Sequence, residues 1–219
     1  MRQTMAPQGT VLFDLFGVIA QHQSSEMRTV LVSISGAPAP AFWDAYWRLR
    51  PPYDRGELTG PGYWREVGAA LGTRFGAARI GALIDADVSS WSGVEGEMVA
   101  LVEELAAAGR RLGLLSNIPP ELATHYEAHH SWLRHFEVCG FSCRIGHAKP
   151  DPEAYVWCVR MLGGQPPDVL FVDDREENVD AARAVGLRGA LFTGVADLRA
   201  TLREHRLDAG GPGTGPTED

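Results

Sequence analysis

Cysteine is scarce in this sequence of 219 residues, and the three that occur are Cys139, Cys143 and Cys158. Their number is odd and no two of them form a C-x-x-C pair, which argues against a disulfide framework. Free thiols are typical of a reducing compartment, so we expect a cytoplasmic location. We interpret these cysteines as packing residues rather than nucleophiles, because free cysteine is among the residue types most often buried.

Positive charge is also in short supply, since 20 Lys and Arg stand against 28 Asp and Glu and the formal net charge is -8. Proteins that bind nucleic acid through its phosphates have the opposite balance, so we expect no nucleic-acid partner. Long apolar runs are missing as well. No segment approaches the roughly 18–20 residues of a membrane span, and residues 1–10 lack the apolar core of a signal peptide. We therefore expect no membrane partner.

The composition that remains is typical of a globular protein, with 45% hydrophobic and 22% charged residues. Short apolar runs alternate with helical patterns along most of the chain. Strands are predicted at 11–13, 111–115, 169–172 and 189–192, and helices at 98–105, 152–162, 178–185 and about 198–202. Strands that alternate with helices favour a parallel sheet covered by helices on both faces. The predicted fold class is therefore α/β, with a Rossmann-like core.

Residues 21–92 have a different character, because aromatic residues recur there at helical spacing and no run is typical of a strand. Pro51-Pro52 and the segment 54–56 indicate breaks between helices. We interpret this region as a small helical cap inserted after the first strand. The predicted organisation is a core domain of residues 1–20 and 93–207, a cap of residues 21–92, and a Gly/Pro-rich acidic tail of residues 208–219, which we expect to be disordered.

Three of the predicted strands end in residues that are suited to chemistry. They are Asp14 after the first strand, Ser116 and Asn117 after the second, and Asp173 and Asp174 after the third. In open α/β sheets ligands bind beyond the carboxyl ends of the strands, so we expect these distant residues to converge. The loop before Pro150 adds a positive charge, Lys149.

Together these residues make a plausible site for phosphoryl transfer. Asp14 and Asp174 offer oxygen ligands to a hard cation such as Mg2+. That cation, Lys149 and the Ser116 hydroxyl would neutralise a bound phosphoryl group, and such transfer depends chiefly on positioning and charge stabilisation. Asp14 is then a candidate carboxylate nucleophile that forms an aspartyl-phosphate, which water later hydrolyses.

With these residues in this order, the sequence resembles the haloacid dehalogenase superfamily, and within it the group with a helical cap after the first strand. The four matching motifs are FDLFGV at 13–18, LLSN at 114–117, KP at 149–150, and FVDD at 171–174 followed by Asn178. The segment DRGEL at 54–58 is similar to the corresponding segment of one subgroup, which is related to α-D-glucose-1-phosphate phosphatase and to the N-terminal phosphatase domain of soluble epoxide hydrolase.

The resemblance implies a role for each matching residue. Asp14 would be the nucleophile, and Asp14, Asp174 and the backbone carbonyl of Phe16 would hold Mg2+. The remaining roles are contact with the phosphoryl group by Ser116 and Asn117, charge balance by Lys149, orientation of that lysine by Asp173, and support of the last motif by Asn178.

One position departs from the pattern of this superfamily. Most of its phosphatases have an Asp two residues after the nucleophile, which protonates the leaving group, and here that residue is Phe16. The loss is tolerable if the leaving group is good, or if His22 or His147 supplies the proton instead. It is also the pattern of 2-haloacid dehalogenases in this superfamily, which have an aromatic residue there because halide leaves without a proton.

The paired acids at 173–174 favour the metal-dependent reaction, since clustered carboxylates repel and a cation relieves the repulsion. We therefore predict a Mg2+-dependent phosphatase that acts on a small phosphorylated metabolite with a good leaving group. A 2-haloacid dehalogenase and an inactive phosphate-binding protein are the alternatives. Arg55 contacts the substrate or forms an ion pair with Glu57, and Trp43, Trp47 and Trp64 line the pocket or pack in the cap. A monomer or a homodimer is expected.

Overall fold

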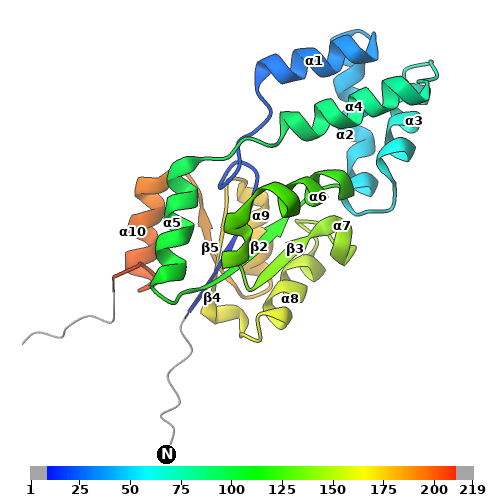
Figure 1. Ribbon diagram of the computed structural model, residues 1–219. Helices are drawn as coiled ribbons and strands as arrows, with labels where there is room; N and C mark the ends of the chain where they lie inside the picture. Colours follow the sequence, from blue (N-terminus) through cyan, green and yellow to red (C-terminus); the bar gives the residue numbers. More distant parts are fainter. Residues whose placement is uncertain (1–8, 211–219) are drawn as a thin grey trace, which may run out of the picture.

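The computed structural model describes residues 9–210, so residues 1–8 of the predicted core and 211–219 of the predicted tail lie outside it. Strands and helices alternate along most of this range (Figure 1). The strands are β1 Thr10–Phe13, β2 Arg111–Ser116, β3 Val138–Phe141, β4 Val169–Asp173 and β5 Arg188–Leu191. The helices are α1 Ser25–Ser35, α2 Ala39–Asp54, α3 Gly60–Ala70, α4 Ala77–Ser90, α5 Gly96–Ala107, α6 Pro120–His129, α7 Ser142–Ile145, α8 Pro152–Met161, α9 Glu176–Ala184 and α10 Val195–Glu204, with short 3-10 helices η1 Ser131–His135 and η2 Pro166–Asp168.

The five strands form one parallel sheet in the order β3-β2-β1-β4-β5, which confirms the predicted α/β class. β1 lies at the centre and pairs with both β2 and β4. The register places Phe13 beside Leu114 on one side and beside Val172 on the other. The residues that follow these three strands therefore emerge next to one another at a single edge of the sheet.

Alternate residues of the strands pack on opposite faces of the sheet, as the period of two requires. Val11 and Phe13 belong to a core that includes residues of α5, α6 and α10. Leu12 and Phe171 belong to the core on the other face, which includes residues of α8 and α9. The three central strands β1, β2 and β4 are buried on both faces, which explains why they read as continuous apolar runs in the sequence.

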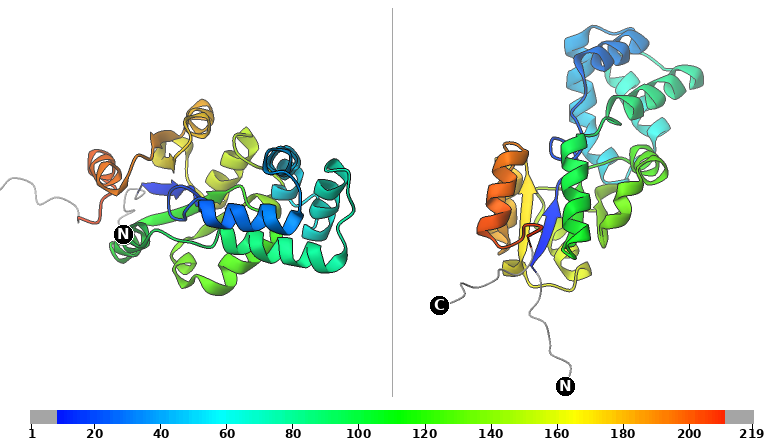
Figure 2. Two further views of the ribbon diagram at one scale, coloured as in Figure 1. Left: turned by 90° about the horizontal axis from the view of Figure 1, so that it is seen from above. Right: turned by 60° about the vertical axis from the view of Figure 1, so that its left-hand side comes forward.

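The helices α1 to α4 form a cap with a hydrophobic core of its own, inserted after β1 (Figures 1 and 2). That core is largely aromatic. Tyr46, Tyr63 and Trp64 are among its fully buried side chains, and Tyr53 stacks on Tyr63 with ring centroids 4.4 Å apart. The helical cap is as predicted, whereas its exact limits at residues 21 and 92 stay a prediction.

Several elements differ from the sequence-based expectation, and the helices α6 and α7 are among those not predicted. The strand β3 was not predicted, because it is short and contains Gly140, a poor strand former. Glycine is required there, since a Cβ on it would lie 2.6 Å from the Cys158 sulfur. The helix α2 also continues through Pro51 and Pro52 to its end at Asp54.

The prolines in α2 are tolerated because they fall near its C-terminal end. A proline inside a helix lacks the N–H that would bond to the carbonyl four residues earlier. Those carbonyls belong here to Trp47 and Arg48, two exposed residues in the second half of the helix. The helix then closes through the Arg55 N–H, which donates to the Pro51 carbonyl at 3.1 Å.

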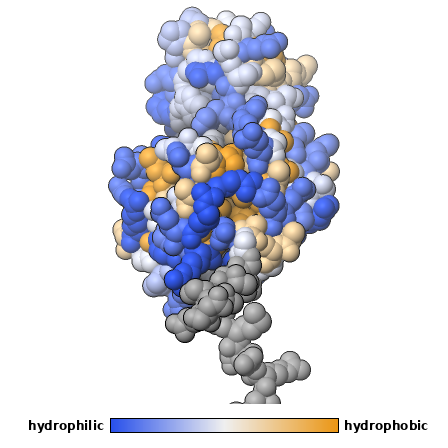
Figure 3. Space-filling view, turned by 90° about the vertical axis from the view of Figure 1, so that its left-hand side faces the viewer, coloured by the Kyte–Doolittle hydropathy of each residue, from blue (hydrophilic) through white to orange (hydrophobic). Residues whose placement is uncertain are grey.

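The surface is mostly hydrophilic on the face drawn in Figure 3, where hydrophobic patches concentrate on the core rather than on the cap. Among residues 9–210, no helix has the length and apolar character needed to cross a bilayer.

Candidate active site

Asp14 is the first residue beyond β1, and the sheet fixes its position. Its backbone N–H donates to the Val172 carbonyl of β4 at 2.8 Å, which extends the ladder by one step. Its Oδ1 accepts a hydrogen bond from the Leu15 N–H at 2.6 Å. The side chain is nearly buried, with 5% of its surface exposed, yet it lines the cavity between core and cap.

Lys149 forms ion pairs with two carboxylates at once. Its Nζ lies 2.5 Å from Asp14 Oδ1 and 2.7 Å from Asp173 Oδ2. Burial raises the pKa of the Asp14 carboxyl to about 8, an effect that the Lys149 ammonium opposes. Burial also opposes the charge on Lys149, but the two neighbouring carboxylates raise its pKa above the ordinary value. Positive charge is therefore held permanently beside Asp14.

Asp173 uses both carboxylate oxygens for contacts within the protein. Besides Lys149, it accepts hydrogen bonds from the Asn178 side-chain amide at 3.0 and 3.1 Å and from the Arg175 N–H at 2.8 Å. Asn178 lies in the first turns of α9 and is buried. Asp173 is thus suited to orienting Lys149, and it has no oxygen free for a cation.

Asp174 is different, because one of its oxygens has no hydrogen-bond partner in the described range. Its Oδ1 is buried and unpaired, while Oδ2 lies 3.0 Å from Nε2 of His22. No backbone N–H of residues 9–210 donates to the Phe16 carbonyl either. Carboxylate oxygens of Asp14, Asp173 and Asp174 all lie within 4.8 Å of one another. The two acceptors without donors, Asp174 Oδ1 and the Phe16 carbonyl, lie beside Asp14 and fit a hard cation, which binds through oxygen ligands.

Gly17 keeps the chain close to these carboxylates. Its φ angle is +83°, in the region that favours glycine, and a Cβ at this position would collide with the Asp174 carboxylate and lie 2.7 Å from His22 Nε2. The glycine after Phe16 therefore allows the loop that follows β1 to pass directly over Asp174.

Ser116, the last residue of β2, and Asn117, which follows it, have different environments. Asn117 forms two hydrogen bonds of 2.8 Å with the backbone N–H and carbonyl of Lys149, which fixes the loop that carries this lysine. Ser116 is fully buried, does not line the cavity, and its hydroxyl has no hydrogen-bond partner in the described chain. The Lys149-Pro150 peptide bond is cis.

These residues surround a cavity of about 800 Å³ between core and cap. Of the residues predicted for the site, Ser116 and Asp173 do not line the cavity; those that do are Asp14, Phe16, His22, Arg55, Asn117, Lys149, Asp174 and Asn178. His147 does not line it, and its Nδ1 lies 3.5 Å from Asp151 instead. Arg55 lines the cavity and also pairs with Glu57 at 2.6 Å.

The three cap tryptophans differ in position. Trp64 is fully buried in the cap core. Trp43 packs against that core and lies beneath the Arg28 guanidinium at 4.5 Å. Trp47 lines the cavity and is 45% exposed. The pocket interpretation therefore applies to Trp47 alone.

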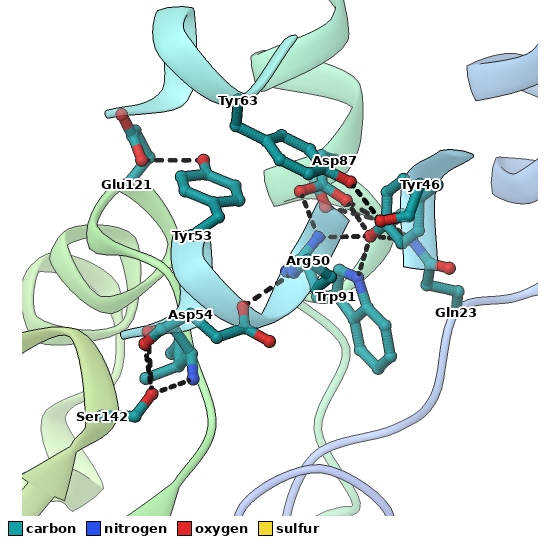
Figure 4. Close-up of polar contacts among 12 residues, drawn as sticks. Gln23, Tyr46, Arg50, Tyr53, Asp54, Tyr63, Asp87, Trp91, Glu121 and Ser142 are labelled. Carbon is teal, nitrogen blue, oxygen red and sulfur yellow. Dashed lines mark hydrogen bonds and ion pairs between the residues drawn. The ribbon is translucent and has the colours of Figure 1, made fainter. Parts of the chain in front are cut away.

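The cap side of the cavity contains a buried polar network that the sequence interpretation missed (Figure 4). Arg50 is 5% exposed and pairs with Asp87 at 2.9 Å and with Asp54 at 2.7 Å. The Tyr46 hydroxyl donates to Asp87 at 2.6 Å and accepts from Nε1 of Trp91 at 3.2 Å. The missed cavity residues Arg50 and Trp91 belong to no motif, although Arg50 lies four residues before Asp54 of DRGEL and Trp91 lies just before the return to the core.

Two hydrogen bonds of this region join the cap to the core. The Tyr53 hydroxyl donates to Glu121 of α6 at 2.8 Å, and the Ser142 hydroxyl donates to the Asp54 carbonyl at 2.5 Å. Figure 4 shows both contacts on the side of the network that faces the core. They hold the C-terminal end of α2 over the carboxyl edge of the sheet.

Comparison with known proteins agrees with this geometry. The family model of haloacid dehalogenase-like hydrolases matches residues 9–186. A sesquiterpene phosphatase, AstK of Aspergillus oryzae, is 30% identical over 158 residues, which cover 70% of this chain and 76% of that protein. Flavin mononucleotide hydrolase 1 of Arabidopsis thaliana is 33% identical over 129 residues, which cover 57% of this chain and 50% of that protein.

Solved structures show the same fold at lower identity. The HAD family enzyme BT-2542 of Bacteroides thetaiotaomicron, in a magnesium complex, has a TM-score of 0.73 at 18% identity, and the alignment covers 89% of this chain and 98% of that one. The L-2-haloacid dehalogenase RSc1362 has a TM-score of 0.61 at 19% identity, over 84% and 86% of the two chains. The fold, the family match and the phosphatase relatives together show that this chain belongs to the haloacid dehalogenase superfamily and is a hydrolase of that family.

Proposed function

We propose that this hydrolase is a Mg2+-dependent phosphatase that acts on a small phosphorylated substrate through an aspartyl-phosphate on Asp14. The observation that carries the proposal is the contact of Lys149 Nζ with both Asp14 and Asp173, beside an Asp174 oxygen that has no partner in the described chain. An array of this kind supplies a nucleophile, a fixed positive charge and a vacant oxygen ligand. The phosphatase names of several relatives support the same reaction class.

Asp14, Asp174 and the Phe16 carbonyl would hold the Mg2+ ion. When bound, that ion neutralises charge on the phosphoryl oxygens and favours the ionised form of Asp14. A structural neighbour supports the choice of ion, since BT-2542 has also been crystallised with magnesium and inorganic phosphate. Asp173 is left out of the ligand set because Lys149, Asn178 and Arg175 occupy its oxygens.

The reaction then needs two displacements at phosphorus. A carboxylate oxygen of Asp14 forms a bond to phosphorus while the bond to the leaving-group oxygen breaks. Water next attacks the phosphorus of the aspartyl-phosphate, the bond to Asp14 breaks, and inorganic phosphate and the carboxylate are released. Lys149, whose Nζ lies 2.5 Å from Asp14 Oδ1, balances the negative charge in both steps.

The leaving group must depart without a proton from the usual position. Phe16 has no titratable group, and its ring packs edge-on against Trp91 at 4.9 Å and Tyr126 at 5.8 Å. General acid catalysis contributes about 10²–10⁴-fold where it operates. The proposed substrate therefore has a good leaving group, whose oxygen takes its proton from water after the bond breaks.

Hydrolysis of p-nitrophenyl phosphate in Mg2+ and in EDTA tests the proposal directly. Its leaving group needs no general acid, so Phe16 does not mask activity. We expect turnover in Mg2+ that EDTA abolishes. Turnover of 2-haloacids instead would identify the dehalogenase alternative, for which the aromatic Phe16 is the supporting observation. Phosphate binding without turnover of p-nitrophenyl phosphate or of 2-haloacids would identify an inactive phosphate-binding protein.

A further inference from the structure

The cavity between core and cap has one wall made of aromatic rings. The Phe16 ring centroid lies 4.9 Å from that of Trp91, and Trp47 continues the wall at 6.2 Å from Trp91. All three side chains line the cavity together with Asp14. The wall therefore runs from a position two residues after the proposed nucleophile to α2 of the cap.

The wall is braced near the core and open near the cap. Trp91 is 9% exposed, and its Nε1 donates to the Tyr46 hydroxyl at 3.2 Å, which fixes the indole ring. Trp47 is 45% exposed although it belongs to the wall. A large aromatic surface that faces a concave site is one that a ligand removes from water with a gain in free energy.

Most polar cap residues on the same cavity already bond to partners within the protein, and the Arg28 guanidinium lies over the Trp43 ring at 4.5 Å. These bonds join Gln23 Nε2 to Ser90 Oγ (2.8 Å), Arg50 Nη1 to Asp87 Oδ2 (2.9 Å), Arg50 Nε to Asp54 Oδ1 (2.7 Å) and Arg55 Nε to Glu57 Oε1 (2.6 Å). A hydroxyl-rich leaving group would have to compete with these bonds, and a polar group left without a partner is costly. An apolar leaving group disturbs none of them.

We propose that the aromatic wall binds the leaving group, and that the substrate is a phosphate monoester of an apolar phenol, whose leaving group needs no proton from position 16. This inference rests on the proposed phosphatase function. Phe16, Trp47 and Trp91 then determine specificity, because they cover the hydrocarbon part of the substrate while its phosphoryl group lies against Asp14. Each methylene that the wall buries contributes about 0.8 kcal/mol, which is about fourfold in Kd.

Calorimetric titration of the whole chain with unbranched alkylphosphonates in Mg2+ tests this inference without turnover. The head group stays constant from methyl- to octylphosphonate, so only contact with the tail changes. We expect Kd to fall by about fourfold for each methylene until the wall is covered. Trp47→Gln should raise the Kd of octylphosphonate by about tenfold or more and leave the Kd of methylphosphonate unchanged. Trp157→Gln, on α8 and outside the cavity, should leave both unchanged.

The outcomes separate the two proposals. If methylphosphonate binds in a Mg2+-dependent manner but longer tails gain nothing, the apolar substrate class is wrong while the phosphatase proposal stands. The same holds if a polyhydroxylated tail of equal length binds more tightly than the alkyl tail. If the affinity of Trp47→Gln rises with tail length as steeply as that of the unmodified chain, the assignment of the wall is overturned. Failure of every phosphonate to bind, together with no hydrolysis of p-nitrophenyl phosphate, would contradict both proposals.

Discussion

At the residue scale, the proposed mechanism depends on one buried carboxylate. Asp14→Asn keeps the shape of the side chain and removes its charge and its ability to attack phosphorus. We expect kcat for p-nitrophenyl phosphate to fall by about 10³-fold or more. Far-UV circular dichroism should show that the fold is retained, because the backbone bond from Asp14 to Val172 remains. Appreciable activity in this folded variant would rule out Asp14 as the nucleophile.

Phe16 allows a test of leaving-group protonation at a single position. Phe16→Asp places a carboxyl group beside the reacting centre, so hydrolysis of unactivated alkyl phosphates should rise by about 10²–10⁴-fold in kcat/KM. Phe16→Asn is the matched control, since it has the same shape without the acid and should give no gain. If both variants retain Mg2+-dependent hydrolysis of p-nitrophenyl phosphate and neither gains on alkyl esters, protonation is not limiting.

The site was predictable to the extent that sheet geometry determines it. Asp14 and Asp174 follow strands that a parallel sheet places side by side, so their convergence follows from strand ends alone. The division of labour within the acid pair, Asp174 for the cation and Asp173 for Lys149, is expected from the family resemblance, but strand ends alone do not determine it. It depends on which oxygens of Asp173 are used by Lys149 and Asn178, and on the contact of His22 with Asp174.

At the scale of elements, the buried ion pair of Arg50 and Asp87 links α2 to α4 within the cap. Asp87→Ala removes one partner and leaves the Arg50 guanidinium buried, with Asp54 as its remaining carboxylate. Breaking a buried pair in this way costs about 3–5 kcal/mol, so the free energy of unfolding should fall by that amount in urea denaturation.

The matched control for this pair lies on the surface of α9. Asp180 pairs with Arg183 at 2.9 Å, but both side chains are at least half exposed. Asp180→Ala should therefore change the free energy of unfolding by no more than about 1 kcal/mol. A loss in Asp87→Ala no larger than this would mean that the buried network does not stabilise the cap.

The elements themselves were predictable where their periodicity is strong and not where local chemistry is ambiguous. The runs at β1 and β4 are buried on both faces, which gives them a clear apolar signal. β3 lies at the edge of the sheet with its first two residues only half-buried, and its Gly140 weakens the pattern. Pro51 and Pro52 indicate a break, but tertiary packing of Tyr53 keeps α2 helical to Asp54.

At the scale of the whole molecule, the placement of the cap over the core is the feature least accessible to sequence. It rests on contacts between remote segments, such as Tyr53 with Glu121 and Ser142 with Asp54. Only Asp54 lies in a segment that the sequence singled out, DRGEL at 54–58, and nothing in that segment indicates its contact with Ser142. The aromatic wall shows the same limit, because Phe16, Trp47 and Trp91 come from the core, the cap and the segment that returns to the core.

The proposed cation site links the core to the stability of the whole chain. Carboxylate oxygens of Asp14, Asp173 and Asp174 lie within 4.8 Å and repel one another, and under the proposal Mg2+ would bind Asp14 and Asp174 only in the folded state. At a concentration of about 100 Kd, such binding stabilises by about 2.7 kcal/mol, which for a chain of this size raises Tm by roughly 5–10 °C. Differential scanning calorimetry in MgCl2 and in EDTA measures the shift. Asp174→Asn should lose most of it and Asp180→Asn, on the surface, should keep it, whereas equal Tm values for the unmodified chain in both buffers would show that these carboxylates hold no cation.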